Sequence, residues 1–442
     1  MKIVQALGWY YPESLGGTEV YVATLSRLLT AMGHEVVVAA PLAGISSPRV
    51  YDHDGQTVYR YPIPSSPTRD EAQGKVPARG SELFRGWLEE VKPDVLHVNS
   101  IVTGLGLHEM RAARLAGARV ILTSHASSLG YICQRGTLMR WGTVPCDGLT
   151  EVVKCSACEL QHRGLPATLA RLIAREPVRV SRALGNFGNP LGTGLGMPDL
   201  IARNRTMQRD LLTLVDHFVV LTKSAAAIVT LNGAPIEKLF VSPLGISNCP
   251  TQRKPAPELQ PTTKPMRLGY LGRFDVVKGV VELAEALRRL PASLDFSFEF
   301  RGPVLTAADR TTFERVRSIS AKDARITFAP AVPQSQVTSV LAGYDLLVCP
   351  SVCAEGGPTV AIEAHAAGTP VVGTRIGGLA EMVDDGINGM LVPPGDVEAL
   401  AEMLASIIDG PPEAIDGWRR RLPPVRTMGD VADDYARLYA GQ

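Results

Sequence analysis

The sequence predicts a two-domain α/β protein in which each domain is built on a doubly wound parallel sheet. Three observations lead to this fold class. The chain has 442 residues, more than one hydrophobic core usually supports. Buried-strand patterns alternate with helical patterns in both halves, which is typical of parallel sheets. A proline-rich stretch with little apolar periodicity, residues 248–265, has the composition of a semi-rigid linker between the halves.

The first half, residues 1–247, opens with a strand pattern over residues 2–10, a glycine pair and a helical pattern over 18–32. Gly33 closes this helix, because glycine adopts a left-handed cap at little cost. The same alternation continues, with strands expected over 34–40, 94–99, 118–124, 217–221 and 239–242, and helices over 81–91, 106–116, 206–215 and 224–231. This half therefore predicts one sheet domain.

The alternation breaks between about residues 130 and 200, which we interpret as an insertion with its own purpose. The insertion contains several cysteines, a helical pattern over 169–182, and the glycine-rich run 192–196. That run lacks the preceding strand that a dinucleotide-binding fingerprint requires. We therefore discount a dehydrogenase and expect a flexible acceptor-side loop.

The second half repeats the strand and helix alternation over residues 266–422. Strands are expected near 267–271, 295–301, 325–329, 345–349, 370–373 and 390–392, with helices between them. A second doubly wound sheet follows from this pattern. The remaining piece, 423–442, begins with two prolines and carries a helical pattern that could pack back onto the first domain.

Charge and hydropathy narrow the class of partner. The formal net charge is +1, so the sequence gives no basic field of the kind that nucleic acids attract. No run of about 20 apolar residues occurs, and the first residues turn polar too soon for a secretory signal. We expect a cytoplasmic protein that acts on small molecules.

The strongest motif runs from Pro350 to Ala364, from the end of a buried strand through a glycine pair into a helix. Ligands of open α/β sheets bind at the carboxyl ends of strands, where helix N-termini attract anions. Free N–H groups near Gly357 could therefore hold a diphosphate, while Glu355 and Glu363 could accept hydrogen bonds from sugar hydroxyls. Two glutamates seen in isolation are more often solvated residues at a helix start.

In its setting, this segment resembles the signature of retaining GT-B glycosyltransferases of the glycosyltransferase family 4 type, in which seven residues separate two glutamates. Glu355 and Glu363 match that spacing. Further matches are Gly272-Arg273-Phe274-Asp275 with Lys278-Gly279, and the stretches 345–351, 368–372 and 389–396. The resemblance covers essentially the second domain and implies two Rossmann-like domains that face each other across a cleft.

The resemblance also implies roles for the second-domain residues. Arg273 and Lys278 would hold the donor diphosphate, and Glu363 the ribose. Glu355 would bind the donor sugar, together with the backbone of Gly356, Gly357, Pro358 and Thr359. The loop 328–332, which ends at Val332, would receive the base.

In the first domain, the resemblance places Gly16 and Gly17 beside the diphosphate and directs His125 toward the donor sugar. Taken alone, a glycine pair is more often a plain turn. His97 also resembles the family, but it lies inside a buried strand, and we interpret it as a satisfied core histidine.

The implied activity is transfer of a sugar from a UDP- or GDP-sugar to a hydroxyl, with retention of configuration, in glycan, polysaccharide or glycolipid synthesis. Two fixed cations and a helix N-terminus can stabilise the departing diphosphate, so we expect no catalytic metal. The acceptor would be a glycan, a lipid-linked sugar or a small molecule.

Three other functions stay open at this point. A hydrolase could use Glu355 and Glu363 as acid and nucleophile, but it would leave Arg273 and Lys278 without a role. A 2-epimerase-like isomerase would bind the same donor without an acceptor, which the insertion argues against. A non-catalytic nucleotide or glycan sensor would have lost a donor-binding residue, and these motifs have lost none.

The insertion offers two further candidate sites. Cys133, Cys146, Cys155 and Cys158 could hold a structural zinc ion or an iron–sulfur cluster, or they could be thiols without a metal. The arginines of the helical pattern recur every three or four residues and so share one helix face. Arg171, Arg175, Arg179 and Arg182 could meet an acidic acceptor or lipid headgroups in a peripheral membrane contact, or form a solvated face.

Overall fold

We describe the fold from a computed structural model, which covers residues 1–14, 16–125, 132–141, 144–185, 187, 189–247 and 262–441. The chain forms two compact units. The first holds residues 1–136, 148–243 and 428–442, and the second holds 137–147 and 244–427. Most of the predicted linker, residues 248–261, lies outside the described residues.

The first unit is built on an eight-stranded sheet in the order β10-β9-β6-β5-β1-β2-β4-β3. All neighbouring strands are parallel except β3 and β4. Its strands are β1 (Lys2–Ala6), β2 (Glu35–Ala43), β3 (Arg49–His53), β4 (Gln56–Ile63), β5 (Val95–Val98), β6 (Arg119–Ser124), β9 (His217–Val220) and β10 (Leu239–Val241). The strand order reverses between β1 and β5, which makes a switch point of the kind at which doubly wound sheets bind ligands.

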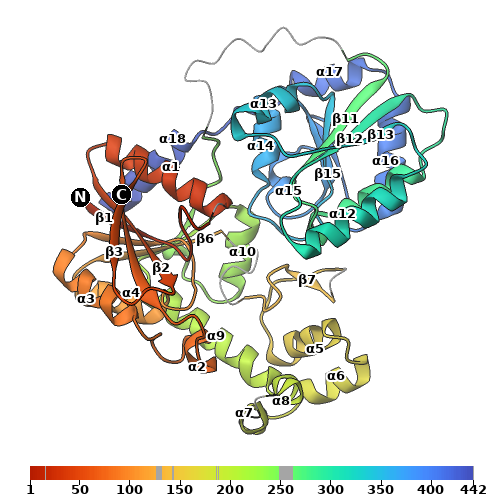
Figure 1. The fold of residues 1–442 in the computed structure, drawn as a ribbon. Coiled ribbons are helices and arrows are strands. Elements are labelled where there is room, and N and C mark those ends of the chain that lie inside the picture. Colours follow the sequence, from red (N-terminus) through yellow and green to blue (C-terminus); the bar gives the residue numbers. More distant parts are fainter. Residues whose placement is uncertain are drawn as a thin grey trace. The chain divides into compact units, whose positions relative to one another are not determined.

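Helices cover both faces of this sheet. They are α1 (Gly17–Ala31), α2 (Arg69–Ala72), α3 (Ser81–Val91), α4 (Leu107–Leu115), α9 (Met197–Leu214), α10 (Lys223–Leu231) and α18 (Met428–Ala440), with a 3-10 turn η1 (Ile236–Lys238). Figure 1 shows α1 and α18 side by side on one face and α3 and α4 on the other. The C-terminal helix thus packs on the first unit, whereas residues 423–427 belong to the second.

The antiparallel pair β3 and β4 was not expected from the sequence. It forms a tight hairpin whose turn residues, Asp54 and Gly55, both have positive φ angles, at 49° and 76°. Two such residues are the requirement of a type I′ turn, and Asp-Gly supplies them at little cost. This dipeptide was the signal that could have predicted the hairpin.

The insertion is largely helical, and its structure differs from two expectations drawn from the sequence. The helix expected over 169–182 is two helices, α6 (Ala167–Ala174) and α7 (Val178–Gly185), because Pro177 interrupts helical hydrogen bonding. The glycine-rich run is not a loop. It forms most of α8 (Pro190–Leu195), which Asn189 caps by accepting a hydrogen bond from the N–H of Gly192 at 2.7 Å.

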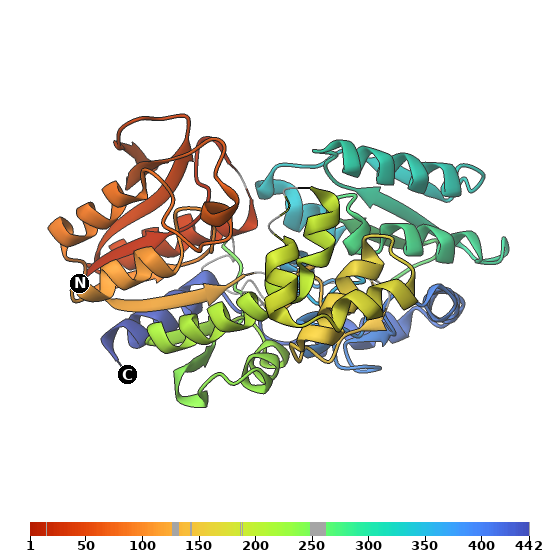
Figure 2. The same cartoon turned by 90° about the horizontal axis from the view of Figure 1, so that it is seen from below.

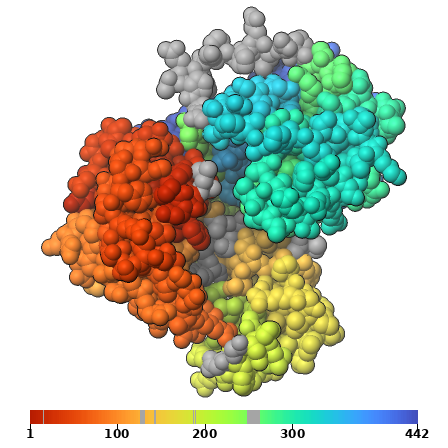
Figure 3. All heavy atoms as spheres, viewed as in Figure 1, coloured from red at the N-terminus to blue at the C-terminus, as the bar shows by residue number. Residues whose placement is uncertain are grey.

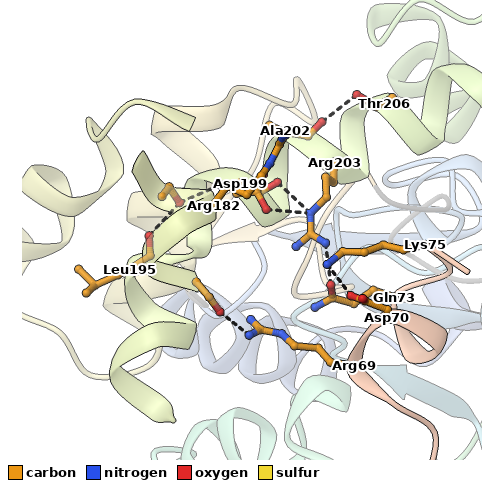
Figure 4. Close-up of polar contacts among 12 residues, drawn as sticks. Arg69, Asp70, Gln73, Lys75, Arg182, Leu195, Asp199, Ala202, Arg203 and Thr206 are labelled. Carbon is orange, nitrogen blue, oxygen red and sulfur yellow. Dashed lines mark hydrogen bonds and ion pairs between the residues drawn. The ribbon is translucent and has the colours of Figure 1, made fainter. Parts of the chain in front are cut away.

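These helices and α5 (Val152–His162) gather beside the first half of α9 (Figure 2). Polar contacts fasten them there (Figure 4). Asp199 of α9 accepts from Arg182 at 3.0 Å and pairs with Arg203 at 3.1 Å. Arg203 also donates to Gln73, which follows α2, at 2.7 Å. The insertion is therefore joined to the sheet domain by a partly buried arginine between two acceptors.

The second unit has a six-stranded parallel sheet in the order β13-β12-β11-β14-β15-β16. Its strands are β11 (Met266–Leu271), β12 (Phe296–Arg301), β13 (Ile326–Ala329), β14 (Leu346–Cys349), β15 (Val371–Thr374) and β16 (Gly389–Val392). Two apolar clusters fill the space between sheet and helices. The order reverses between β11 and β14, so this sheet also has a switch point.

The helices of the second unit are α11 (Val280–Arg288), α12 (Ala307–Ser320), α13 (Gln334–Ala342), α14 (Thr359–Ala366), α15 (Leu379–Met382), α16 (Val397–Asp409) and α17 (Glu413–Arg419), with a 3-10 turn η2 (Val276–Lys278). A short hairpin of β7 (Met139–Arg140) and β8 (Val144–Pro145) also groups with this unit, and the carbonyl of Thr137, just before the hairpin, accepts from the N–H of Ala354 at 3.3 Å.

The predicted class, α/β with two doubly wound parallel sheets, is confirmed. Within the part of the chain that the structure describes, no helix is long and apolar enough to cross a membrane.

Candidate functional site

The site of the second unit begins in the turn after β11. Gly279 lies so close to the end of β14 that a Cβ atom there would be 1.9 Å from the carbonyl oxygen of Pro350. Gly279 also has a φ of 70°, which side chains rarely adopt. Since the N–H of Val352 donates to the carbonyl of Val277 at 3.0 Å, the two loops at the switch point are joined by their backbones.

This close approach brings Lys278 to Glu355. The ammonium of Lys278 donates to one carboxylate oxygen of Glu355, and the hydroxyl of Ser351 donates to the other. Both side chains of the ion pair are largely buried, with 27% and 18% of their surface exposed. Because each oxygen has a charge-assisted or hydroxyl donor, Glu355 has a defined orientation.

A second glycine pair supports the backbone of Glu355 from the β15 side. The N–H of Gly378 donates to the carbonyl of Glu355 at 2.9 Å. A Cβ atom on Gly378 would lie 2.6 Å from the Cα of Gly357, so two chain segments touch here without side chains between them. Gly356 and Gly357 lie in this contact, with Gly357 at a φ of 117°.

Arg273 has a different environment from the one expected. Its guanidinium donates to Asp275 at 3.0 Å and is half exposed. Its carbonyl accepts from the hydroxyl of Tyr270 at 2.6 Å, which fixes the backbone of the turn. The structure therefore brings Lys278 and Glu355 together and leaves Arg273 beside them in sequence, paired with its own loop.

Helix α14 begins directly after this loop. Pro358 is its N-cap and the exposed Thr359 is its first residue, so the first N–H groups of the helix are available to a ligand. Glu363, one turn further on, is half-buried and accepts from the side chain of Gln334. Burial raises the pKa of the Glu363 carboxyl, although the Gln334 hydrogen bond opposes the rise.

The segment expected to receive the base lies between β13 and α13. Val332 is half-buried against the apolar cluster that covers α13 and α14. The carbonyl of Pro330 accepts from Arg301 at 3.0 Å, and Arg301 forms a two-bonded ion pair with Glu299 at 2.8 and 2.9 Å. This anchoring holds the segment beside Gln334 and therefore near Glu363.

In the first unit, Gly16 is the N-cap of α1 and Gly17 is its first residue. A carboxylate already occupies this helix start: Glu19 is buried and accepts from the hydroxyl of Ser14 at 2.6 Å. A Cβ atom on Gly16 would lie 2.7 Å from a carboxylate oxygen of Glu19. The glycine therefore leaves space for the acidic side chain that caps the helix dipole.

His125 follows β6 and lies among neutral groups. Its Nε2 is 3.1 Å from the side-chain oxygen of Asn99, and its ring meets that of Tyr21 edge-on at 4.7 Å. Burial lowers its pKa to about 4, so the imidazole is uncharged at neutral pH. His97 is fully buried and bonded at both nitrogens, to Tyr439 at 2.6 Å and Thr123 at 2.7 Å, which confirms its interpretation as a satisfied core histidine.

The metal site, one of the two alternatives for the cysteines, finds no support in the structure. Across the described ranges, no group of three or more His, Cys, Asp or Glu side chains is placed to hold a metal ion. Cys155 and Cys158 are one turn apart on α5, whereas Cys133 lies in a loop and Cys146 directly follows the β7–β8 hairpin. The expectation that Arg171, Arg175, Arg179 and Arg182 share one helix face is also wrong, because they divide between α6, its C-cap and α7.

Sequence reasoning missed three residues that hold the candidate side chains. Ser351 bonds Glu355, Gln334 bonds Glu363, and Asn99 bonds His125. Ser351 and Asn99 each lie just after a buried strand, and this position was the signal that could have identified them. Gln334 had no such signal, since it opens a helix of ordinary composition.

Comparison with known proteins gives two family matches, one for each half of the chain. Residues 265–410 match the family described as "Glycosyl transferases group 1", and residues 16–149 match the "Glycosyl transferase 4-like domain". The chain is 26% identical over 441 residues to 2-deoxystreptamine N-acetyl-D-glucosaminyltransferase of Streptomyces fradiae, covering 96% of this chain and 88% of that one. It is 24% identical over 413 residues to D-inositol 3-phosphate glycosyltransferase of an Arthrobacter species, covering 90% and 82%.

Solved structures show the same fold over the full chain. Sucrose-phosphate synthase from Thermosynechococcus elongatus superposes with a TM-score of 0.65 at 19% identity, covering 100% of this chain and 99% of that one. HepE of Anabaena, solved in complex with UDP and glucose, superposes with a TM-score of 0.61 at 13% identity, with both chains covered completely. These neighbours are GT-B glycosyltransferases, which confirms the expected architecture of each unit.

The buried His97 and the half-buried His125 predict how stability depends on pH. Burial lowers the pKa of His97 to about 3 and that of His125 to about 4, below the usual 6.5. The unfolded chain therefore binds more protons than the folded chain below pH 6.5, so stability is full above that value and falls as the pH drops toward 4. Urea unfolding measured at intervals between pH 7 and 4.5 should show the midpoint decreasing.

In the His125→Gln variant, the amide can still donate to Asn99 but does not titrate. The decrease in unfolding free energy between pH 6 and 5 should then be shallower by about 1.4 kcal/mol per pH unit. An equal slope in the variant and in the unchanged protein would contradict a neutral, buried His125.

Proposed function

The chain belongs to the group 1 glycosyltransferases, and from this premise we propose that it transfers a sugar from a UDP- or GDP-sugar to an acceptor hydroxyl with retention of configuration. The observation that carries the proposal is the arrangement of Lys278, Ser351 and Glu355 at the switch point, next to the start of α14. A fixed cation and free helical N–H groups together suit a diphosphate.

The donor would lie along the second sheet from β11 to α14. Lys278 and the first N–H groups of α14 would meet the diphosphate, and Arg273 would turn from Asp275 toward it, since its guanidinium is half exposed. Glu363 would accept from the ribose hydroxyls. Burial raises its pKa, and hydrogen bonds from two hydroxyl donors would favour the charged carboxylate. Glu355 and the backbone of the 356–359 loop would meet the sugar.

The reaction needs charge stabilisation more than proton transfer by the protein. As the bond from sugar to phosphate breaks, negative charge grows on the diphosphate, and the fixed cations stabilise it without a divalent metal. The departing phosphate oxygen can take the proton of the acceptor hydroxyl on the same face, which gives retention. Neither glutamate needs to act as a nucleophile, and the pairing of Glu355 with Lys278 favours a binding role.

We assign the acceptor to the first unit. The relatives that span most of the chain are named for 2-deoxystreptamine and for D-inositol 3-phosphate, so we favour a small acceptor that carries ring hydroxyls over a glycan or a lipid-linked sugar. An isomerase of the 2-epimerase kind remains the second candidate. It would convert the donor without any acceptor, and nuclear magnetic resonance of the donor alone would reveal that product.

Substitutions in the donor site provide the direct test. Lys278→Ala removes the cation that we place at the diphosphate, and Glu363→Ala removes the ribose acceptor. Each should weaken donor binding or kcat/KM by about tenfold or more, equivalent to roughly 1.4 kcal/mol. Calorimetry with the donor and steady-state kinetics measure the two effects.

The matched controls are Lys322→Ala and Glu314→Ala, which remove exposed side chains of the same kinds at or near α12. Both should leave donor affinity unchanged. If Lys278→Ala and Glu363→Ala behave like these controls, the assignment of the donor site fails.

The donor itself can be identified by thermal unfolding in a panel of nucleotide sugars and free nucleotides. A ligand present at 100 times its dissociation constant stabilises the folded state by about 2.7 kcal/mol, so one nucleotide and one sugar should raise the Tm above all others. The same panel with Lys278→Ala should lose that shift. Equal shifts for all nucleotides in both proteins would argue against a specific donor site.

We also propose that the insertion touches an anionic membrane surface. Helix α6, yellow in Figure 3, exposes Leu172 by 64%, with Leu169 and the charged Arg171 and Arg175 beside it. Apolar side chains next to arginines are typical of helices that lie at a lipid interface. Of the 21 large apolar side chains that are exposed among the described residues, five lie between 169 and 191.

The membrane contact predicts binding to vesicles that contain phosphatidylglycerol and weak binding to neutral ones. Arg171→Glu with Arg175→Glu should lower the bound fraction by about tenfold or more, because each arginine near an anionic surface is worth about 1 kcal/mol. The control pair, Arg310→Glu with Arg315→Glu on α12, changes the net charge equally and should bind as before. Similar losses of vesicle binding in both double variants would mean that the insertion does not form a specific membrane-binding surface.

A further inference from the structure

A chain of buried polar side chains runs through the first unit, and the donor-site chemistry does not use it. Its members come from β1, from β5 and the residue after it, from β6, and from the C-terminal helix α18. They are Gln5, His97, Asn99, Thr123, Tyr435 and Tyr439, each with 3% or less of its surface exposed. Buried polar groups at this depth are costly unless each finds a partner.

Each member is hydrogen-bonded to the next. Asn99 donates to Gln5 at 3.0 Å, and Gln5 donates to the hydroxyl of Tyr439 at 3.1 Å. The Tyr439 hydroxyl is 2.6 Å from Nδ1 of His97. The chain continues from Nε2 of His97 to Thr123 at 2.7 Å and from Thr123 to Tyr435 at 2.6 Å.

The direction of these hydrogen bonds follows from one group, the backbone carbonyl of His97, which can only accept a hydrogen bond. The side-chain nitrogen of Asn99 faces the backbone carbonyl of His97 at 3.4 Å as well as Gln5. A carbonyl oxygen cannot donate, so the amide group must face it with its N–H₂. The oxygen of Asn99 then faces Nε2 of His125 at 3.1 Å. Because that oxygen is also an acceptor, Nε2 of His125 must carry the proton.

The same logic orients the other half of the chain. The oxygen of Gln5 accepts from Asn99, so its nitrogen donates to Tyr439. Tyr439 can then donate its own proton to Nδ1 of His97, whose Nε2–H donates to Thr123. A doubly protonated His97 would leave the Tyr439 proton without an acceptor in the chain. Burial lowers the pKa of His97 to about 3, in agreement with a neutral ring.

We propose that this chain is a positioning network that holds His125 as the neutral tautomer protonated on Nε2, with Nδ1 as a hydrogen-bond acceptor for a sugar or acceptor hydroxyl. Tyr439 of α18 is the positioning residue. Among the described residues, the structure gives Nδ1 of His125 no hydrogen-bond partner. The inference rests on the proposed function and on the role that the family resemblance implies for His125 at the donor sugar.

Tyr439 matters because it decides which way the Gln5 amide faces. Without its hydroxyl, the buried nitrogen of Gln5 loses its acceptor, and the amide gains nothing from its present orientation. If Gln5 turns over, its nitrogen meets that of Asn99. The 3.4 Å contact of Asn99 with the His97 carbonyl is longer than its 3.0 Å bond to Gln5, so we expect Asn99 to turn as well. Asn99 would then offer N–H to His125, which would respond by moving its proton to Nδ1.

The test uses Tyr439→Phe in the full chain, with Tyr61→Phe as the matched control. Tyr61 is an equally buried phenol of the same unit that donates to the carbonyl of Gly104 at 2.9 Å, outside the network. Tyr439→Phe should lower kcat by about tenfold while KM for the donor changes less than twofold, because we place the contacts to the diphosphate and the ribose on the second unit. Tyr61→Phe should change neither, although both variants lose a buried hydrogen bond.

The readout that a purely structural role would not move is the tautomer of His125. With ¹⁵N-labelled histidine, long-range proton–nitrogen spectra should show Nε2–H in the unchanged protein and in Tyr61→Phe, and a shift toward Nδ1–H in Tyr439→Phe. Gln5→Met, which breaks the same link and leaves α18 intact, should give the same shift. It serves as the second variant if Tyr439→Phe folds poorly.

An unchanged His125 tautomer in both network variants, or an equal loss of kcat in Tyr439→Phe and Tyr61→Phe, would overturn the positioning role. A failure of the proposed function would look different. In that case the unchanged protein would transfer no sugar from any nucleotide sugar, whichever tautomer the spectra report.

Discussion

The donor-side geometry depends on the approach of the Gly279 backbone to the carbonyl of Pro350. Any side chain at this position would push apart the loops that follow β11 and β14. Lys278 would then move away from Glu355, and Glu355 would keep a single donor, Ser351. One absent methyl group thus allows a lysine, a serine and a glutamate from two loops to meet where the strand order of the sheet reverses. The chemistry of the site follows from a steric condition on the backbone.

The two candidate site regions satisfy their polar groups in different ways. In the second unit, carboxylates are paired with cations, as in Lys278 with Glu355 and Arg301 with Glu299. In the first unit, the residues around His125 are uncharged and satisfy one another through hydrogen bonds of defined direction. A site for a diphosphate benefits from fixed charge, whereas a neutral imidazole is preserved by surroundings without any.

Much of this could be predicted from the sequence, because regular alternation and strand ends are local signals. The doubly wound sheets and the position of Glu355 and Glu363 near the switch point followed from such signals, whereas Lys278 was identified through the family resemblance. The predictions that were wrong had ignored a specific residue: Pro177 divides the arginine helix, and Asn189 with Pro190 starts a helix in a glycine-rich run. For the four cysteines, spacing in sequence says little about which elements hold the thiols. The Gln5–Tyr439 contact joins residues 434 positions apart, and no local pattern contains that information.

The place of α18 also has a consequence for synthesis on the ribosome. Strands β1, β5 and β6 emerge early, yet Gln5, His97 and Thr123 find their tyrosine partners 434, 342 and 312 residues later in the chain. Until those residues have left the exit tunnel, the nascent first unit has polar side chains that lack their tyrosine partners and an uncovered sheet face beside α1. Contacts of such long range form slowly and leave partly folded intermediates exposed. The first unit therefore becomes complete only after the second has been made. In a nascent chain that ends before α18, polar side chains of β1, β5 and β6 stay exposed to solvent.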